Sequence, residues 1–220
     1  MTRAFLDISV TPSVRTMQVA NGARPYTAAS RPVSGVDQLG ESEQRFIEDR
    51  DSFYLATVSE TGWPYVQHRG GPKGFLHLLD GRTLAFADFR GNRQYISTGN
   101  LTASDRAAII LVDYANRRRL KLYARVEMRS TAESPELTAR VAPRDYRGVP
   151  ERVVVLRLEA FDWNCSQHIT PRFDEAQVLR IMEPVRARIA QLEAENAALR
   201  ALNPGAGDRR DSPRVETPGT

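Results

Sequence analysis

The fold of this chain is constrained above all by a series of short apolar runs, separated by turn residues, between residues 53 and 161. Residues 120–128 alternate apolar and polar side chains, which is typical of a strand with one buried face. Residues 106–114 and 152–161 carry continuous aliphatic runs, which indicate strands buried on both faces or closed into a barrel. The helical patterns between these runs are brief. The sequence therefore predicts a mainly β protein, a β-barrel with peripheral helices.

Most of the residues that suggest chemistry fall within residues 53–101. Turns are marked there by Thr61-Gly62 and by Asp80-Gly81, a dipeptide that favours two-residue hairpins. We expect four strands of one meander, at residues 53–59, 64–69, 75–79 and 83–88.

A helix N-terminus is predicted directly after the fourth strand. A glycine and Asn92 precede a helical pattern that runs from Arg93 to about residue 101, so Asn92 is the expected N-cap. The free N–H groups and the dipole of such a helix favour an anion, and the guanidinium of Arg93 matches phosphate oxygens. Arg69 ends the second strand, and the meander would bring it beside this helix. We infer a phosphate site of Arg69, Asn92, Arg93 and Gln94; the alternative is ordinary helix capping beside a solvated arginine.

A resemblance to a known family rests on three segments in order: HRGGPKGF, LAFADFRGNRQYIS and AAIILVDYANRRRLKLYARV. Their order and spacing resemble the flavin-nucleotide-binding family related to pyridoxamine 5′-phosphate oxidase, over about residues 41–173. The resemblance implies a split β-barrel homodimer that binds FMN at the subunit interface and acts as an oxidoreductase on a small molecule. The alternative is a protein of the same fold that holds a flavin, a deazaflavin (F420) or heme without turnover.

The resemblance also implies site residues. Arg69, Arg93 and Gln94 match the family's phosphate-binding positions, and Ala87 and Asp88 match the strand end that runs alongside the flavin. The family's oxidases usually carry Lys where Gln94 stands. Their lysine-rich substrate contacts have no counterpart here, which argues against oxidation of pyridoxamine phosphate itself.

Four further residues are expected at the cofactor. Arg119 stands where the family places a polar residue that reaches the flavin from the second subunit, and Trp163 resembles a late tryptophan near the ring. Gln67 and His68 precede Arg69 on the same strand, and His68 is the candidate contact to the ring or substrate and the candidate catalytic residue. The alternatives are a structural role for His68 and core packing for Trp163.

The chain is expected to divide into four parts. Residues 1–40 form an N-terminal extension with a short helix at residues 13–20, and residues 41–173 form the FMN-binding split barrel. Within the barrel domain, Ser42 is expected to cap a helix at residues 43–50, and a second helix is expected at residues 133–141. A C-terminal helix is expected within residues 174–203, and residues 204–220 lack apolar content and are expected to be disordered.

The C-terminal helix is expected to begin at about residue 183, with Pro184 in its first turn. Its apolar positions recur in steps of three and four, which predicts a short parallel two-stranded coiled coil with Asn196 at an a position. The alternative is an amphipathic helix that lies on its own barrel. The positions concerned are Met182, Val185, Ile189, Leu192, Asn196 and Leu199.

Composition excludes several classes of protein. With 41% hydrophobic and 26% charged residues, the chain is too apolar for general disorder and fits one folded domain with extensions. Cys165 is the single cysteine, so no intramolecular disulfide can form, and a reducing compartment is natural. No stretch reaches the ~18 apolar residues of a membrane helix. We therefore expect a cytoplasmic protein with no membrane partner.

Metal and nucleic-acid binding are not expected either. Cys165 and His168 have C-x-x-H spacing, but without a second pair of ligands they do not predict a metal site. The net charge of +4 is spread along the chain, and no basic region precedes the C-terminal heptads. The expected partners are a second copy of the chain and a small-molecule substrate.

Overall fold

The computed structural model describes residues 2–23, 37–143, 146–163 and 167–202. The chain divides into two compact units, Met1–Pro171 and Arg172–Thr220, and each is described by itself. The expectations for Cys165 and for residues 204–220 lie outside the described residues.

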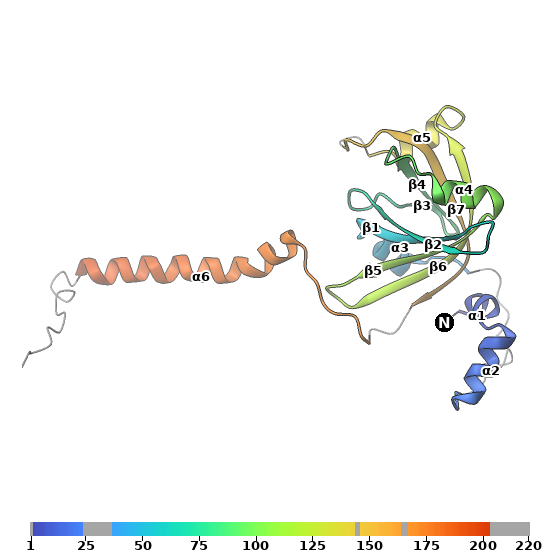
Figure 1. The fold of residues 1–220 in the computed structure, drawn as a ribbon. Coiled ribbons are helices and arrows are strands. Elements are labelled where there is room, and N and C mark those ends of the chain that lie inside the picture. Colours follow the sequence, from blue (N-terminus) through green and yellow to red (C-terminus); the bar gives the residue numbers. More distant parts are fainter. Residues whose placement is uncertain (1, 24–36, 144–145, 164–166, 203–220) are drawn as a thin grey trace, which may run out of the picture. The chain divides into compact units, whose positions relative to one another are not determined.

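The first unit is built on one antiparallel sheet of seven strands in the order β2-β1-β5-β6-β7-β4-β3 (Figure 1). The predicted β protein with peripheral helices is confirmed at this level, and nearly every strand lies within a few residues of its predicted position. The strands are β1 (Ser52–Val58), β2 (Pro64–Gly70), β3 (His77–Asp80), β4 (Thr83–Phe89), β5 (Arg106–Asp113), β6 (Arg118–Ser130) and β7 (Pro150–Trp163).

The predicted four-strand meander is wrong. The β1–β2 and β3–β4 hairpins form, but β2 and β3 lie at opposite ends of the strand order and do not pair. The long strands β6 and β7 separate the hairpins, since β5 joins β1 to β6 and β7 joins β6 to β4. The β6–β7 register shifts between Tyr123 and Ala124, an irregularity that bends a strand pair. The sheet curves so far that Arg69 of β2 contacts Asp88 of β4.

The core lies inside this curved sheet. Strand β5 alternates buried and half-buried residues, so only one of its faces is fully buried. Its continuous aliphatic run had also been compatible with burial on both faces. Three aromatic rings pack at the centre: Phe53 stacks on Phe75 at 5.5 Å between centroids and meets Phe86 edge-on at 5.2 Å. Such pairs contribute beyond the area they bury.

The first unit has five helices among its described residues: α1 (Arg3–Ser9), α2 (Pro12–Ala20), α3 (Glu41–Glu48), α4 (Ile96–Ala103) and α5 (Pro135–Val141). Helix α2 confirms the N-terminal prediction, and the Thr11 hydroxyl accepts a hydrogen bond from the Val14 N–H. Helix α3 begins at Glu41 rather than after Ser42, because Gly40 takes the N-cap position and its N–H donates to Glu43 at 3.0 Å.

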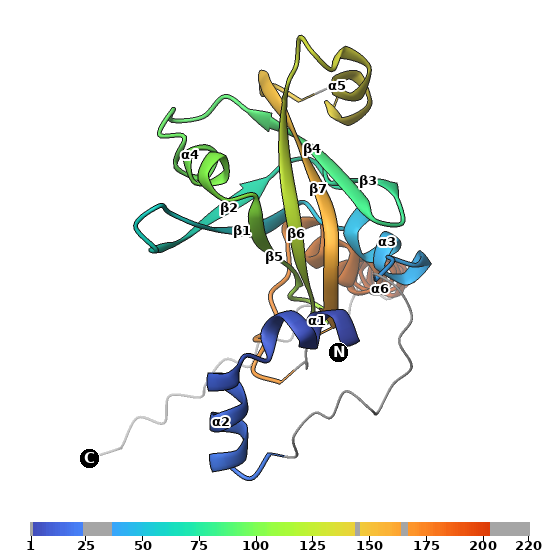
Figure 2. The ribbon, with the colours of Figure 1, turned by 90° about the vertical axis from the view of Figure 1, so that its right-hand side faces the viewer.

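Helix α1 was not expected, and it packs against the sheet. Figure 2 shows it across the ends of β6 and β7. Phe5 stacks on Tyr123 of β6 with 4.9 Å between ring centroids. Thr2 caps the helix and donates a hydrogen bond to the Phe161 carbonyl at 2.9 Å. These contacts tie the start of the N-terminal extension to the barrel.

Up to residue 202, where the described part of the second unit ends, it contains one helix, α6 (Glu175–Leu202), of 28 residues. Its predicted start at residue 183 is wrong, because Pro184 lies inside the helix. The start is instead fixed by Asp174, whose carboxylate accepts the Gln177 N–H at 2.7 Å while the Gln177 side chain accepts the Asp174 N–H at 2.9 Å. This reciprocal pair is a capping box. No residue of α6 is buried. None of the described helices has the length and apolar character to cross a membrane.

Candidate functional site

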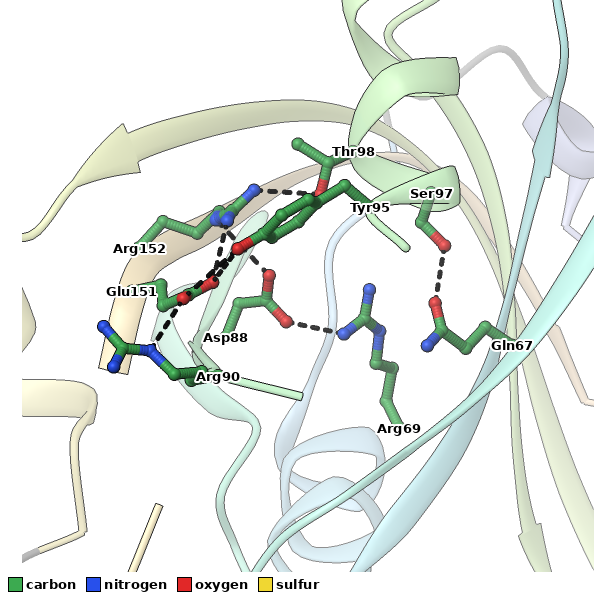
Figure 3. Close-up of polar contacts among 9 residues, drawn as sticks. All are labelled: Gln67, Arg69, Asp88, Arg90, Tyr95, Ser97, Thr98, Glu151 and Arg152. Carbon is green, nitrogen blue, oxygen red and sulfur yellow. Dashed lines mark hydrogen bonds and ion pairs between the residues drawn. The ribbon is translucent and has the colours of Figure 1, made fainter. Parts of the chain in front are cut away.

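A small pocket of about 50 Å³ opens where the ends of β2 and β4 meet the start of α4 (Figure 3). It brings together residues that are far apart in the sequence. The residues that line it are Gln67, Arg69, Asp88, Phe89, Gly91, Asn92, Arg93, Tyr95, Ser97, Thr98 and Glu151.

Arg69 enters the pocket because of the alternation along β2. Gln67 and Arg69 are half-buried on one face, whereas His68 is exposed on the other. The Arg69 Nη1 lies 2.5 Å from the Asp88 Oδ1, and the two side chains are only 17% and 9% exposed. The Nε of Arg69 is also buried, and no described group accepts its hydrogen bond. Leaving a buried donor without an acceptor costs about 1–3 kcal/mol, so this N–H indicates a place for an acceptor atom, of a ligand or of an ordered water.

Asp88 lies between two guanidinium groups. It pairs in register with Arg152 of β7, and the Arg152 Nε lies 3.5 Å from the second carboxylate oxygen. Arg152 also donates to the Thr98 hydroxyl at 3.0 Å, and its guanidinium lies 5.0 Å from the centroid of the Tyr95 ring. Through these contacts Arg152 links β7, β4 and the first turn of α4.

Glu151 forms a second ionic cluster beside the first. Its carboxylate accepts hydrogen bonds from Arg90 at 3.0 Å, from the Tyr95 hydroxyl at 3.2 Å and from Arg152 at 3.1 Å. Burial acts to raise the pKa of Glu151, but these hydrogen bonds and the charge of Arg152 outweigh it and hold the pKa below its ordinary value. Glu151 is therefore a fixed anion that orients two arginines and a tyrosine.

The predicted helix start at Arg93 with Asn92 as N-cap is wrong. Helix α4 begins at Ile96 after Tyr95, and no side chain caps it. The Asn92 side chain instead accepts the Gln94 N–H at 3.2 Å, which closes a local turn. Arg93 and Tyr95 both have left-handed backbone conformations, with φ of 61° and 50°. Such residues cannot continue a helix. The first turn of α4 still contributes Ser97 and Thr98 to the pocket.

The charges around the pocket favour an anion. Arg93 is exposed, and within the described residues it makes no hydrogen bond or ion pair. Asp88 and Glu151 are both engaged by arginines, so neither is available as a general base. Four guanidinium groups and two carboxylates leave a formal excess of two positive charges, from Arg69, Arg90, Arg93 and Arg152 against Asp88 and Glu151. This balance suits a phosphate monoester.

Five predicted site residues are not among those that line this pocket: His68, Ala87, Gln94, Arg119 and Trp163. His68 is on the outer face of β2, where its ring meets Tyr54 edge-on at 5.5 Å. Ala87 is buried in a separate apolar cluster with Val141 and Val153, on the opposite face of β4 from Asp88. Gln94 is exposed and is not among the lining residues.

Arg119 and Trp163 lie near the other end of β6 and β7 from the pocket of the same chain. Arg119 pairs in register with Val112 across the β5–β6 hairpin. Trp163 donates from its indole nitrogen to Glu43 at 2.7 Å and meets the Phe46 ring edge-on at 4.8 Å. These contacts support the core-packing alternative for Trp163.

Five residues at the site were not predicted from the sequence: Glu151, Arg152, Tyr95, Ser97 and Thr98. A signal existed for the first two, because a Glu-Arg pair stands at the start of the last strand. Its meaning depended on the pairing of β7 with β4, which is not a local property of the chain. For Tyr95 no sequence signal existed, because nothing in the neighbouring residues predicts a left-handed backbone conformation at a tyrosine. Among the described residues, no group of three or more acidic, His or Cys side chains could hold a metal ion.

Comparison with known proteins complements this geometry. A sequence model of the pyridoxamine 5′-phosphate oxidase family matches residues 39–164, which is more than half of the chain. No match was found among curated proteins.

Several solved structures are similar to this chain at low sequence identity. HupZ from Group A Streptococcus is 16% identical, with 61% of this chain and 99% of that chain covered and a TM-score of 0.44. An F420 reductase is 22% identical, with coverages of 56% and 98% and a TM-score of 0.42. An FMN-binding protein from Syntrophomonas wolfei subsp. wolfei is 14% identical, with coverages of 56% and 85% and a TM-score of 0.41. On the family match, this chain is a member of the pyridoxamine 5′-phosphate oxidase family.

Proposed function

We propose that this protein binds FMN, with the phosphate group in the pocket formed by β2, β4 and α4, and that it is an oxidoreductase acting on a small molecule. The observation that carries the proposal is the buried Nε of Arg69, a hydrogen-bond donor without an acceptor in a pocket of net positive charge. Membership of the pyridoxamine 5′-phosphate oxidase family supports the choice of a flavin nucleotide.

The residues of the pocket fit a phosphate group. Arg69 offers its Nε, Arg93 offers a guanidinium with no other engagement among the described residues, and the uncapped first turn of α4 offers backbone N–H groups. The Ser97 hydroxyl donates its one hydrogen to Gln67 at 2.9 Å, so it would donate to a phosphate oxygen only after turning away from Gln67. Asp88 and Glu151 hold the arginines in place.

The chemistry of such a protein resides in the cofactor. When bound, FMN supplies hydride or electron transfer, and the protein supplies binding, orientation and electrostatics. This division agrees with a pocket whose two carboxylates are both ion-paired. His68 remains the candidate contact to the ring or substrate, from the outer face of β2.

We further propose a homodimer, in which Arg119 reaches the cofactor of the other subunit. Support comes from exposed apolar side chains on the β1–β2 hairpin: Trp63 is 76% and Val66 60% exposed. Beside them, Tyr54 and Val66 line an apolar depression together with Phe5 and Tyr123. A second copy that covered this surface would bury it around a two-fold axis.

The test is a titration of the purified protein with FMN, followed by its visible spectrum and by mass spectrometry of any cofactor that copurifies. Saturable FMN binding, with bleaching by a reductant and return of colour on addition of an acceptor, is the expected result. Tight binding of F420 or heme in place of FMN would support the alternative, a binding protein without turnover. Failure to bind any of the three would overturn the proposal.

A further inference from the structure

We propose that α6 pairs with α6 of a second copy of this chain as a parallel, in-register, two-stranded coiled coil. This proposal goes beyond the cofactor site and does not depend on FMN. It rests on the exposed apolar stripe of α6, on the charges beside the stripe, and on Asn196.

The stripe follows a heptad repeat over nearly the whole helix. Successive members are separated by four, three, four, three, four and three residues. Its apolar members are between 40% and 60% exposed in the single chain, so no described residue buries the stripe. In the heptad notation, Met182, Ile189 and Asn196 occupy a positions, and Val178, Val185, Leu192 and Leu199 occupy d positions. Because the capping box at Asp174 starts the helix earlier than predicted, the apolar stripe is longer than predicted and includes Val178.

Pro184 is compatible with this seam. In the same heptad frame it occupies a c position, on the side of the helix away from a partner. The carbonyl that loses its hydrogen-bond donor to the proline ring is that of Arg180, at an f position. An f position faces solvent in a two-stranded coiled coil, so water can satisfy this carbonyl.

The charges that flank the stripe are complementary to a second, parallel copy. In a parallel dimer, each g position lies beside the e position five residues later on the partner helix. Arg188 at g would meet Glu193 of the second copy at e, and Glu195 at g would meet Arg200 of the second copy at e. Both pairs have opposite signs, and two-fold symmetry doubles them.

These charges have no ion-pair partners within their own helix. The residues four positions before and after Arg188 are Pro184 and Leu192, and those around Glu195 are Gln191 and Leu199. Arg188 donates to the neutral Gln191 at 2.9 Å, and Gln191 donates to Glu195 at 2.8 Å. The opposite charges are thus spaced for contact between helices rather than within one helix.

Asn196 decides the orientation. In an antiparallel pair, a positions face d positions, so Asn196 would be buried against an apolar residue of the partner and would lose its hydrogen bonds. In a parallel, in-register pair, Asn196 faces its own copy and the two amides can bond to each other. A buried Asn at an a position also favours two strands over three. The alanines at the f positions, Ala187, Ala194 and Ala201, favour the helix without adding surface to bury.

A cysteine cross-link in the full-length chain tests the pairing. In a Cys165→Ser background, Leu199→Cys at a d position is expected to form a disulfide-linked dimer in a glutathione redox buffer. The matched control is Ala201→Cys at an f position, which is expected to cross-link at least roughly tenfold less at equal protein concentration, because only the d position holds the thiols at high effective concentration. No cross-link at Leu199→Cys, or equal cross-linking of both variants, would overturn the proposal.

A charge exchange tests the register independently. Glu193→Arg replaces both of the expected Arg188–Glu193 pairs with two facing arginines. It is therefore expected to reduce cross-linking of Leu199→Cys severalfold. Adding Arg188→Glu to the same chain restores opposite signs and is expected to restore the yield. If the double variant remains as defective as the single one, the parallel in-register arrangement is wrong. FMN titration of the same variants is expected to be unchanged, which separates this outcome from a failure of the proposed cofactor site.

Discussion

Arg69 and Asp88 are joined by an ion pair with 2.5 Å between Nη1 and Oδ1, although their strands, β2 and β4, are separated by four others in the sheet. The contact closes the curved sheet on one side and leaves the second arginine donor, Nε, buried and unbonded. One interaction thus serves both the fold and the proposed phosphate site. Substitutions in and around the pair can separate these two roles.

Arg93→Ala is expected to weaken FMN binding by at least about tenfold, because a charge-assisted hydrogen bond to phosphate contributes about 1.5–3 kcal/mol. The stability of the fold should not change, since Arg93 is exposed and makes no polar contact among the described residues. FMN affinity is measured by titration and stability by urea unfolding. Arg45→Ala on α3, where the arginine is 73% exposed, is the control and should bind FMN normally. An unchanged affinity in Arg93→Ala would remove Arg93 from the site.

Asp88→Ala is expected to lower the free energy of unfolding by about 3 kcal/mol, because it leaves Arg69 and Arg152 near-buried without their shared carboxylate. Asp49→Ala is the matched control. It breaks the pair of Asp49 with Lys73, whose side chains are 57% and 66% exposed, and should cost less than about 1 kcal/mol. Equal losses in the two variants would contradict the structural role of the buried pair.

A mixed dimer of Arg93→Ala and Arg119→Ala chains is expected to recover one intact FMN site per dimer. The reason is that the two residues would serve the same cofactor from different subunits, so one of the two sites in the mixed dimer contains both arginines. The mixed species is purified with two different affinity tags and titrated with FMN. If neither site regains affinity, Arg119 does not act across the interface.

Stability should also depend on pH through Glu151. Its pKa in the folded protein lies below the ordinary value, so it contributes stability when the pH is above the pKa of the unfolded chain. That contribution is lost as the pH falls through the lower, folded-state pKa. Wild type is therefore expected to be more stable than Glu151→Gln above about pH 5, with the difference shrinking toward about pH 3.

Urea midpoints of both proteins across this pH range are the measurement. Glu60→Gln in the exposed β1–β2 turn is the control and should follow wild type throughout. A difference between wild type and Glu151→Gln that stays constant with pH would contradict the assigned cause, since it would reflect packing rather than charge.

The strands could be predicted because their signals are local. The alternation at Leu120, Leu122 and Ala124 is visible in the sequence and corresponds to buried positions on β6. The order of the strands could not be predicted, because both hairpins are complete local units and nothing in either one shows that β7 will pair with β4. Arg69 was therefore predicted to lie beside the helix that follows β4 for an incorrect reason, the meander. The true reason is the curvature of the long β6–β7 pair.

The site was predicted only in part, for similar reasons. Arg69 and Arg93 could be inferred from residue type and position, and both line the pocket. The helix start was misplaced by three residues, because the left-handed conformations of Arg93 and Tyr95 leave no trace in composition. The capping box of Asp174 and Gln177 was visible in the sequence. The start of α6 was misplaced because Pro184 was interpreted as a first-turn proline.

The position of β7 has a consequence for the order in which this protein is made. The β1–β2 and β3–β4 hairpins leave the ribosome early, but the strand that joins the second hairpin to the rest of the sheet begins only at Pro150. Contacts of such long sequence separation form late in folding. Arg152, which holds Asp88 from one side, emerges with that strand. The nascent chain therefore carries Arg69 and Asp88 on separate hairpins until synthesis of the barrel is almost finished, and the proposed phosphate site can form only afterwards.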